Sequence, residues 1–180
     1  LLLLFNTVHL LSSHYLISGQ SAQESGNLDQ AIALYHQSLK LRPYHVPAMV
    51  QLSDAYARKK MLPEALACLE RASVFEPWRP SVNFNTGSVL ARLGKVDQAI
   101  ARFETFLSLS RTGMQSIDAR VSLSILHLTR NEPDRALSYL RSALESDPDN
   151  TLANYQAGRA YEMLGNMEKA RIYYSRSGKR

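Results

Sequence analysis

The chain of 180 residues contains a single cysteine, Cys68, so one chain can form neither a disulfide framework nor a cysteine-rich metal site. Its 8 glycines and 7 prolines are too few for a collagen-like or linker-rich sequence. No Lys, Arg, Asp or Glu precedes Glu24, but polar residues interrupt the apolar start of the chain from Asn6 onward. This interruption disfavours a membrane-spanning helix, which needs about 20 consecutive apolar residues.

The composition is that of a globular protein, with 45% hydrophobic and 21% charged residues, and it excludes extensive disorder. The 21 Lys and Arg residues outnumber the 16 Asp and Glu residues, which gives a net charge of +5. This excess mildly favours acidic partners or surfaces.

Two interpretations of residues 1–11 stay open. The apolar residues recur at helical spacing, as Leu1, Leu4, Phe5, Val8 and Leu11. This spacing predicts a terminal helix that packs on the next element. The run also resembles the apolar core of a signal peptide or anchor, although the basic residues expected before such a core are absent. A signal or anchor remnant would make the protein exported or membrane-tethered rather than cytoplasmic, and it is the only membrane attachment that the sequence suggests.

The rest of the chain carries an internal repeat, the mark of an array of small structural units. Five segments each contain an alanine that is followed four residues later by a large residue. The alanines are Ala31, Ala65, Ala99, Ala136 and Ala170, spaced 34, 34, 37 and 34 residues apart. The residues twelve positions before them are all small: Gly19, Ser53, Gly87, Ser124 and Gly158. The residue twelve positions after the alanine is a proline in three copies, at Pro43, Pro77 and Pro148.

Each copy is predicted to form two amphipathic helices joined by a short turn, near 46–59 and 63–75 in the second copy. The small residue on the first helix and the alanine on the second let the two backbones approach closely, and the large residue fills the space beside this contact. The prolines end the second helix, because proline has no N–H and clashes with the preceding turn. No alternating pattern typical of a strand competes, so the chain is predicted to be all α.

This order of small, large and proline positions resembles the repeat unit of the tetratricopeptide repeat (TPR) family. The resemblance covers Ser12–Ser177 and implies a TPR solenoid, a right-handed superhelix of about ten antiparallel paired helices. It divides the chain into an N-terminal segment and five repeats, at 1–11, 12–45, 46–79, 80–116, 117–150 and 151–180.

Departures from the family pattern are local. Arg111 takes the place of a proline, and 3 extra residues, 37 rather than 34 between the marker alanines, lie between the third and fourth copies. His127 replaces a large apolar residue, and Phe106 replaces a small one. The capping helix of the family is missing after the fifth repeat, so we expect a partner or another domain to cover Tyr173 and Tyr174.

No motif for catalysis or for a cofactor is present in the sequence. GxSxG, HExxH and phosphate-loop patterns are missing, and the histidines have no suitable partner at metal-ligand spacing. We therefore predict no cofactor, no metal site and no enzymatic activity. Nucleic-acid binding is disfavoured as well, because the aromatic residues fall mostly on core positions and the basic residues are scattered among acids.

The resemblance to TPR proteins also implies a binding surface, because in this family the first helices of successive repeats line a concave groove for a peptide or a partner helix. The fifth residue of every copy is apolar: Leu16, Val50, Phe84, Val121 and Tyr155. The next residue is a carboxamide in three copies: Gln51, Asn85 and Gln156. A carboxamide both donates and accepts hydrogen bonds, so it suits a peptide backbone. Alternatively, the apolar row packs between neighbouring helices and the amides are only solvated.

A basic and aromatic patch is predicted at the second and third repeats. It comprises Arg58, Arg92, Trp78, Arg79 and Phe84. Trp and Arg are enriched at binding hot spots, and Arg pairs with carboxylates in a bidentate manner. The expected ligand is therefore an acidic segment with one or two large apolar anchors, and Arg159 of the fifth repeat completes the candidate binding residues.

Alternatives stay open for the patch and for the chain. Trp78 could instead pack the joint between repeats, with the arginines paired to acids such as Asp54. The function that the sequence favours is a non-catalytic protein-binding scaffold or adaptor within a larger protein or assembly. The alternative is a regulatory or substrate-docking TPR region of a larger enzyme, such as a transferase. The lysines and arginines with which one TPR subgroup grips chaperone C-termini are absent, which disfavours that activity.

Overall fold

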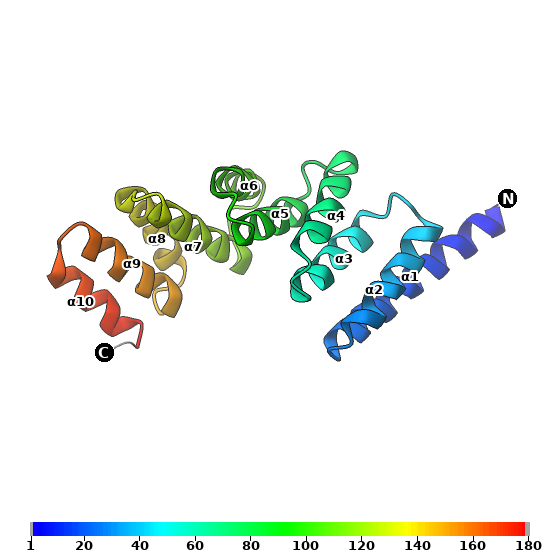
Figure 1. Ribbon diagram of the computed structural model, residues 1–180, viewed down its shortest axis with the longest axis horizontal. Helices are drawn as coiled ribbons and strands as arrows, with labels where there is room; N and C mark the ends of the chain where they lie inside the picture. Colours follow the sequence, from blue (N-terminus) through cyan, green and yellow to red (C-terminus); the bar gives the residue numbers. More distant parts are fainter. Residues whose placement is uncertain (1, 179–180) are drawn as a thin grey trace. The chain divides into compact units, whose positions relative to one another are not determined.

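The computed structural model describes the backbone of residues 2–178 and the side chains of residues 6–178, so the packing predicted for Leu1, Leu4 and Phe5 lies outside the described side chains. All regular structure in this part of the chain is helical (Figure 1). The helices are α1 (Leu2–Glu24), α2 (Leu28–Leu41), α3 (Val46–Arg58), α4 (Leu62–Phe75), α5 (Pro80–Arg92), α6 (Val96–Leu109), α7 (Met114–Thr129), α8 (Pro133–Ser146), α9 (Thr151–Met163) and α10 (Met167–Arg176). The predicted all-α fold class is confirmed. α1 runs through the predicted N-terminal segment into the first repeat without a break.

The helix boundaries follow from local chemistry. The side chains of Asn27, Asn150 and Asn166 cap the starts of α2, α9 and α10 by accepting a hydrogen bond from a backbone N–H of the first turn. Proline occupies the first turn of α3, α4, α5 and α8, where its missing N–H would have no partner inside the helix.

A residue with positive φ stands at the same position of every repeat, in the turn between its two helices. These residues are Gly26, Lys60, Gly94, Asn131 and Gly165, with φ between 60° and 84°. Glycine and asparagine adopt this left-handed conformation readily, whereas lysine does so at a cost. Lys60 is therefore a residue that the chain tolerates rather than one that the turn favours.

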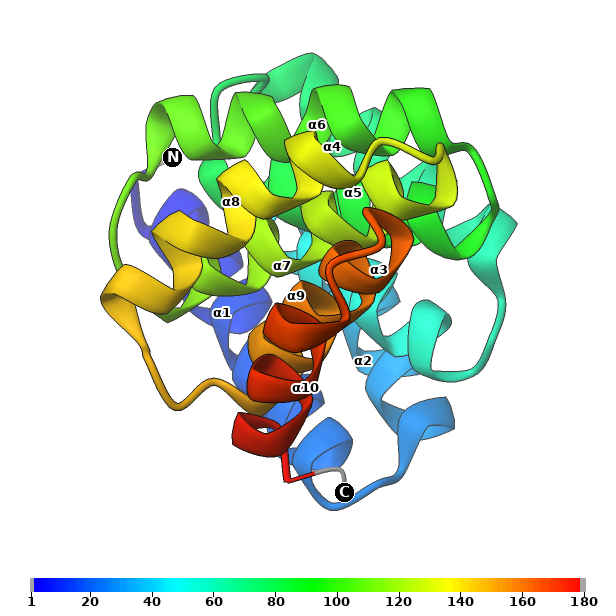
Figure 2. The same cartoon turned by 90° about the vertical axis from the view of Figure 1, so that its left-hand side faces the viewer.

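The chain divides into two compact units, Leu1–Lys95 and Val96–Arg180. The division falls between α5 and α6, inside the stretch 80–116 for which we predicted the third repeat. In the first unit α1, α2 and α3 all contact one another, and α3 in turn contacts α4 and α5. In the second unit α7 contacts α6, α8 and α9, and α9 and α10 lie side by side (Figures 1 and 2).

The core of the first unit contains the contact predicted from the repeat. The ring of Tyr35 is fully buried against Gly19, where an added Cβ would lie 2.5 Å from the ring. The Tyr35 hydroxyl donates a hydrogen bond of 3.1 Å to Gln23 Oε1. At the other end of the same helix pair, the buried Ser38 hydroxyl donates to the Ser12 carbonyl at 2.9 Å, so polar and apolar contacts together fix α1 on α2.

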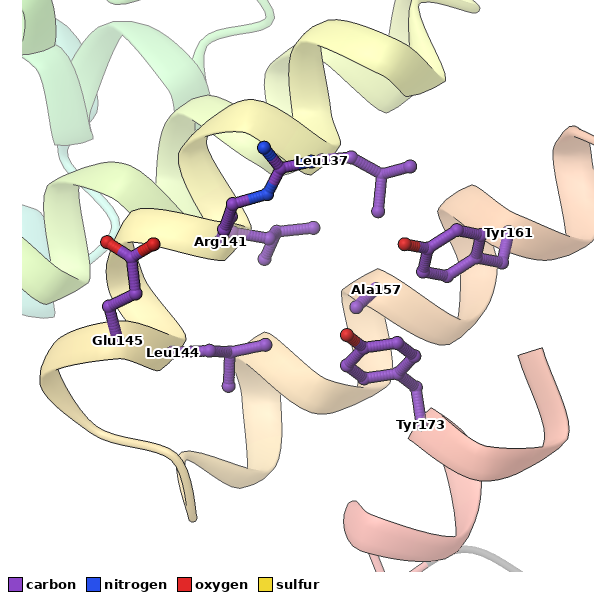
Figure 3. Close-up of a pocket in the computed structure, with 8 residues that line it drawn as sticks. Leu137, Arg141, Leu144, Glu145, Ala157, Tyr161 and Tyr173 are labelled. Carbon is purple, nitrogen blue, oxygen red and sulfur yellow. The ribbon is translucent and has the colours of Figure 1, made fainter. Parts of the chain in front are cut away.

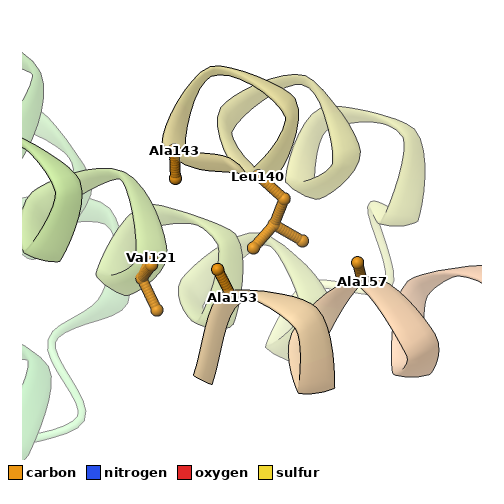
Figure 4. Close-up of a cluster of buried hydrophobic side chains, with 5 residues drawn as sticks. All are labelled: Val121, Leu140, Ala143, Ala153 and Ala157. Carbon is orange, nitrogen blue, oxygen red and sulfur yellow. The ribbon is translucent and has the colours of Figure 1, made fainter. Parts of the chain in front are cut away.

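The second unit repeats this arrangement. Leu140 and Ala143 of α8 pack between Val121 of α7 and the two alanines Ala153 and Ala157 of α9, and all five are buried (Figure 4). The small side chains on α9 bring its backbone close to α8, which buries the leucine completely. A buried leucine contributes about 1.5–3 kcal/mol to folding relative to an exposed one.

The departures from the repeat pattern are accommodated within the second unit. The buried His127 ring lies 2.7 Å from Glu132, measured from Nδ1 to Oε2, and stacks on Tyr139 at a centroid distance of 5.5 Å. Phe106 is fully buried. The extra residues before the fourth repeat lengthen its first helix, because α7 has 16 residues where α3, α5 and α9 each have 13.

Gly19 lies against Tyr35 and Gly158 lies against Tyr174, and these two contacts predict different responses to the same substitution. Gly19→Ala places a methyl group against the fully buried Tyr35, and we expect this overpacking to cost about 1–3 kcal/mol. Alanine recovers up to about 1 kcal/mol of helix propensity, which leaves a net loss of up to about 2 kcal/mol. In Gly158→Ala the clashing Tyr174 is only half-buried and turns outward, so we expect little net change. Urea-unfolding midpoints of both variants measure the difference, and a Gly19→Ala variant as stable as the parent contradicts the packing described here.

The left-handed turn residues predict a stabilising change. Lys60→Gly removes the cost of holding an exposed L-residue at a φ of 63°, and we expect a gain of about 0.5–1 kcal/mol after the entropy of glycine in the unfolded chain is subtracted. Lys60→Ala keeps the Cβ and serves as the control. Thermal unfolding midpoints should rise for the glycine variant alone, and an equal rise for alanine would assign the effect to the lost lysine side chain.

Candidate functional site

The candidate groove in the first unit is formed by first helices, because α3 contacts both α1 and α5. The apolar row predicted along it ranges from half-buried to buried: Leu16 and Phe84 are half-buried, and Val50 is buried. Between α3 and α5 lies an open cleft of about 160 Å³. Its lining comprises Ser53, Asp54, Ala57, Phe84, Asn85, Ser88, Val89 and Arg92.

Polar side chains on the wall of this cleft are held by neighbours. Asp54 accepts a hydrogen bond of 2.7 Å from Gln23 Nε2 of α1 and forms an ion pair of 2.9 Å with Arg58 Nε. The Ser88 hydroxyl donates to the Phe84 carbonyl at 3.0 Å. The carboxamide of Asn85 is half-buried at the cleft, and Gln51 of α3 is half-buried as well. The cleft thus combines an aromatic ring with a carboxamide that can both donate and accept.

Arg58 and Arg92, two of the three arginines of the predicted patch, have partners on the first helices. Arg58 pairs with Asp54, as the alternative interpretation of the sequence anticipated. Arg92 donates from Nη2 to the backbone carbonyl of Ala57 at 2.8 Å, across to the last turn of α3. The Ala57 carbonyl also accepts the backbone N–H of Lys60 at 3.0 Å, so Arg92 adds a second, charged donor from another helix and fixes α5 against α3.

The structure does not gather the predicted patch at one place. Trp78 is 71% exposed in the loop before α5, so it does not fill the joint between repeats. Arg79 precedes α5 and pairs with Glu76 at 2.5 Å. Arg92 ends the same helix, and 13 residues of α-helix separate the two arginines by about 20 Å. Phe84 lies between them and belongs to the cleft.

The candidates of the second unit are engaged internally. Val121 belongs to the buried core, and Tyr155 is half-buried with its ring 5.6 Å from that of Tyr174. Gln156 is buried and accepts a hydrogen bond of 3.1 Å from Nη1 of the half-buried Arg159. The carboxamide and the arginine therefore bind each other across the surface of α9.

Five of the eight residues that line the cleft are not among the binding candidates that the sequence predicts: Ser53, Asp54, Ala57, Ser88 and Val89. The sequence marks Asp54 only as a partner of the arginines and Ser53 only as a small packing residue. The spacing of Asp54 and Arg58, one helical turn apart, is the signal for the ion pair. No comparable signal exists for the contact between Asp54 and Gln23, because it joins two helices.

Two other kinds of site are absent from the described residues. No group of three or more His, Cys, Asp or Glu side chains in this part of the chain is placed to hold a metal ion. None of its helices combines the length and the apolar character that crossing a membrane requires.

Profiles of the tetratricopeptide repeat family match residues 22–80, 52–122 and 121–178. Together they extend from α1 to the end of α10. The chain belongs to the tetratricopeptide repeat family. The resemblance drawn from the sequence is thereby confirmed.

Known proteins share this TPR fold. The crystal structure of MamA superimposes with a TM-score of 0.82 at 22% identity, over 93% of this chain and 90% of that one. The crystal structure of YrrB, described as a TPR protein with an unusual peptide-binding site, superimposes with a TM-score of 0.76 at 24% identity, over 91% and 82% of the two chains. The predicted TPR solenoid is thus confirmed as the fold.

Among curated proteins, the chain is 39% identical over 67 residues to the chloroplastic TPR domain-containing protein PYG7 of Arabidopsis thaliana. The aligned part is 37% of this chain and 22% of that protein. The chain spans about a fifth of the length of the curated relatives that it matches.

Arg58 and Arg92 have different partners, so we expect their substitutions to change the free energy of unfolding by different amounts. Arg92→Ala removes the charge-assisted hydrogen bond that joins α5 to the Ala57 carbonyl of α3, and we expect a loss of about 1.5–3 kcal/mol. Arg58→Ala removes an exposed ion pair, whose contribution is about 0–1 kcal/mol. Urea unfolding followed by circular dichroism measures both. An Arg58 variant that loses as much as the Arg92 variant would contradict this division of roles.

Proposed function

We propose that this TPR chain is a non-catalytic scaffold that binds a peptide segment or a partner protein in the groove of its first helices. The observation that carries the proposal is the cleft between α3 and α5, where an aromatic side chain and a carboxamide meet at a half-exposed surface. Of the sequence-predicted residues, those at or beside this groove are Leu16, Val50, Gln51, Phe84, Asn85 and Arg92.

The proposed roles follow from the chemistry of the cleft. Phe84 contacts an apolar side chain of the ligand, and Asn85 exchanges hydrogen bonds with its backbone. Asp54 and Arg92 hold the helices that carry these groups, because their polar atoms bind α1, α3 and α5 to one another. The cleft itself therefore has little unpaired charge, and we infer that it selects for apolar and backbone contacts.

The comparisons support the class of ligand. YrrB is described as having a peptide-binding site, and another relative is anaphase-promoting complex subunit 3 of Schizosaccharomyces pombe, a component of an assembly. A second candidate function is a docking region of a larger enzyme. The curated relatives, of which the chain spans about a fifth, carry their TPR regions within longer proteins, and this second candidate supposes the same for an enzyme.

We also propose that a partner or another domain covers the last hairpin. Large apolar side chains are exposed on it, at Met163, Leu164, Met167 and Ile172. The tyrosines expected to need cover are half-buried: the Tyr173 ring stacks on Tyr161 at 5.3 Å, and the Tyr174 hydroxyl donates to Glu162 at 2.5 Å. Their remaining exposed surface adds to the apolar face that a partner would bury.

The groove is tested with a peptide selected against the whole chain from a display library. We expect Asn85→Arg, which fills the cleft with a long charged side chain, to weaken binding at least tenfold while the helical circular dichroism stays unchanged. Ala67→Arg is the matched control, because it makes a substitution of similar size on the exposed face of α4. Titration by fluorescence anisotropy measures both. Equal affinities for the two folded variants would exclude the groove as the binding site.

A further inference from the structure

A second open cleft lies on the side of the first unit formed by second helices, between α2 and α4, with α3 beneath. Its volume is about 310 Å³, and its lining comprises His36, Leu39, Lys40, Met49, Leu52, Cys68 and Arg71. Leu39, Met49 and Leu52 are buried and form an apolar floor. The basic side chains of His36, Lys40 and Arg71 belong to exposed residues and form the rim.

Lys40 and Arg71 give the rim positive charge, and none of the described residues that line this cleft carries a carboxylate to offset it. Arg71 is held in place because its Nη2 donates to the Pro43 carbonyl at 2.7 Å, a bond to a neutral group that leaves its charge unpaired. His36 Nε2 lies 2.9 Å from the Tyr56 hydroxyl, also a neutral group. Lys40 lies in the last turn of α2.

Cys68 contributes apolar surface to this cleft and carries no charge. Burial raises the pKa of the Cys68 thiol to about 11, so the group is uncharged at neutral pH. A thiol without charge adds to the apolar floor and does not repel an anion at the rim.

The second unit has a cleft at the equivalent position of its repeats. A cleft of about 220 Å³ lies between α8, α9 and α10 and is lined by Leu137, Leu140, Arg141, Leu144, Glu145, Ala157, Tyr161 and Tyr173 (Figure 3). Counted from the start of each predicted repeat, Leu144 matches Leu39, and Tyr173 matches Cys68. A cleft beside the second helices is thus a recurring feature of the array.

The two clefts differ in charge. Glu145 occupies the repeat position of Lys40, so the cleft of the second unit carries one acid and one base, Glu145 and Arg141. The cleft of the first unit carries bases alone. This difference is a matter of side chains, because the helices around the two clefts are equivalent.

We propose that the cleft between α2 and α4 is a second docking site, which takes an acidic segment of a partner protein. The segment inserts one apolar side chain over Leu39, Met49 and Leu52, and flanking carboxylates pair with Lys40 and Arg71. Charge complementarity and the apolar floor together select this partner, since a nucleic-acid backbone would use the rim and leave the floor empty. The acidic ligand expected from the sequence is thereby assigned to the outer side of the repeats and not to the groove.

The test uses the whole chain with its methionines labelled with ¹³C at the methyl group. The probe is a short peptide of aspartate and glutamate with one central leucine. We expect the signal of Met49, which lies in the floor of the cleft, to shift on titration, and those of Met114, Met163 and Met167 in the other unit to stay in place. A peptide whose leucine is replaced by serine should bind at least tenfold more weakly.

Charge reversal identifies the rim. Lys40→Glu should weaken the peptide at least tenfold, Lys40→Gln should weaken it less, and Lys95→Glu, an equal change of charge at an exposed residue outside the cleft, should leave the affinity nearly unchanged. Raising the salt concentration should weaken binding as well. The groove variant Asn85→Arg should keep the Met49 shift, so the two sites are tested separately.

Three results would overturn the proposal. They are a Met49 signal that does not move at saturating peptide, equal effects of Lys40→Glu and Lys95→Glu, and displacement of the peptide by oligothymidylate at equal concentration. The last result would assign the basic rim to a nucleic acid. The serine peptide requires no protein variant, so it decides the role of the floor even if Lys40→Glu unfolds.

Discussion

Close approach of two helices inside each repeat is the constraint on which the rest of the structure depends. Where a glycine faces a tyrosine, as Gly19 faces Tyr35 and Gly158 faces Tyr174, the ring lies so near the backbone of the first helix that no side chain fits unless the ring moves, and the fully buried Tyr35 has no room to move. The second helix is thereby held at one distance and one rotation. Each first helix then presents its other faces to the groove and to the next repeat.

Polar contacts between first helices complete the groove. Asp54 joins α1 to α3 through Gln23, and Arg92 joins α5 to the end of α3. The charged side chains of Asp54 and Arg92 thus hold helices in position instead of facing a ligand. What is left for a ligand at the cleft is an aromatic ring and a carboxamide, Phe84 and Asn85, which suits a peptide with an apolar side chain.

On the side of the repeats formed by second helices, the charge of a position is less constrained. Residues there are not needed for the contact within the hairpin, so their charge varies between equivalent positions, as Lys40 and Glu145 do. The hollow beside them recurs because the helices around it are equivalent. One scaffold can therefore carry two surfaces of different chemistry, a groove with paired charges and an outer cleft with unpaired bases.

The sequence by itself determined the helices, their pairing and the family, because the alanine and its partners recur at a spacing that only stacked helical hairpins explain. It also determined which residues lie on the first helices. Tertiary structure alone decided the surroundings of individual residues. The turn at Lys60 carries no glycine signal, Trp78 lies in solvent, and Arg92 binds a carbonyl of another helix. The Ala57 carbonyl that Arg92 meets is distant in sequence, and its position depends on the angle between the helices. A periodic pattern records which face of a helix a side chain is on, but not which atom it meets there.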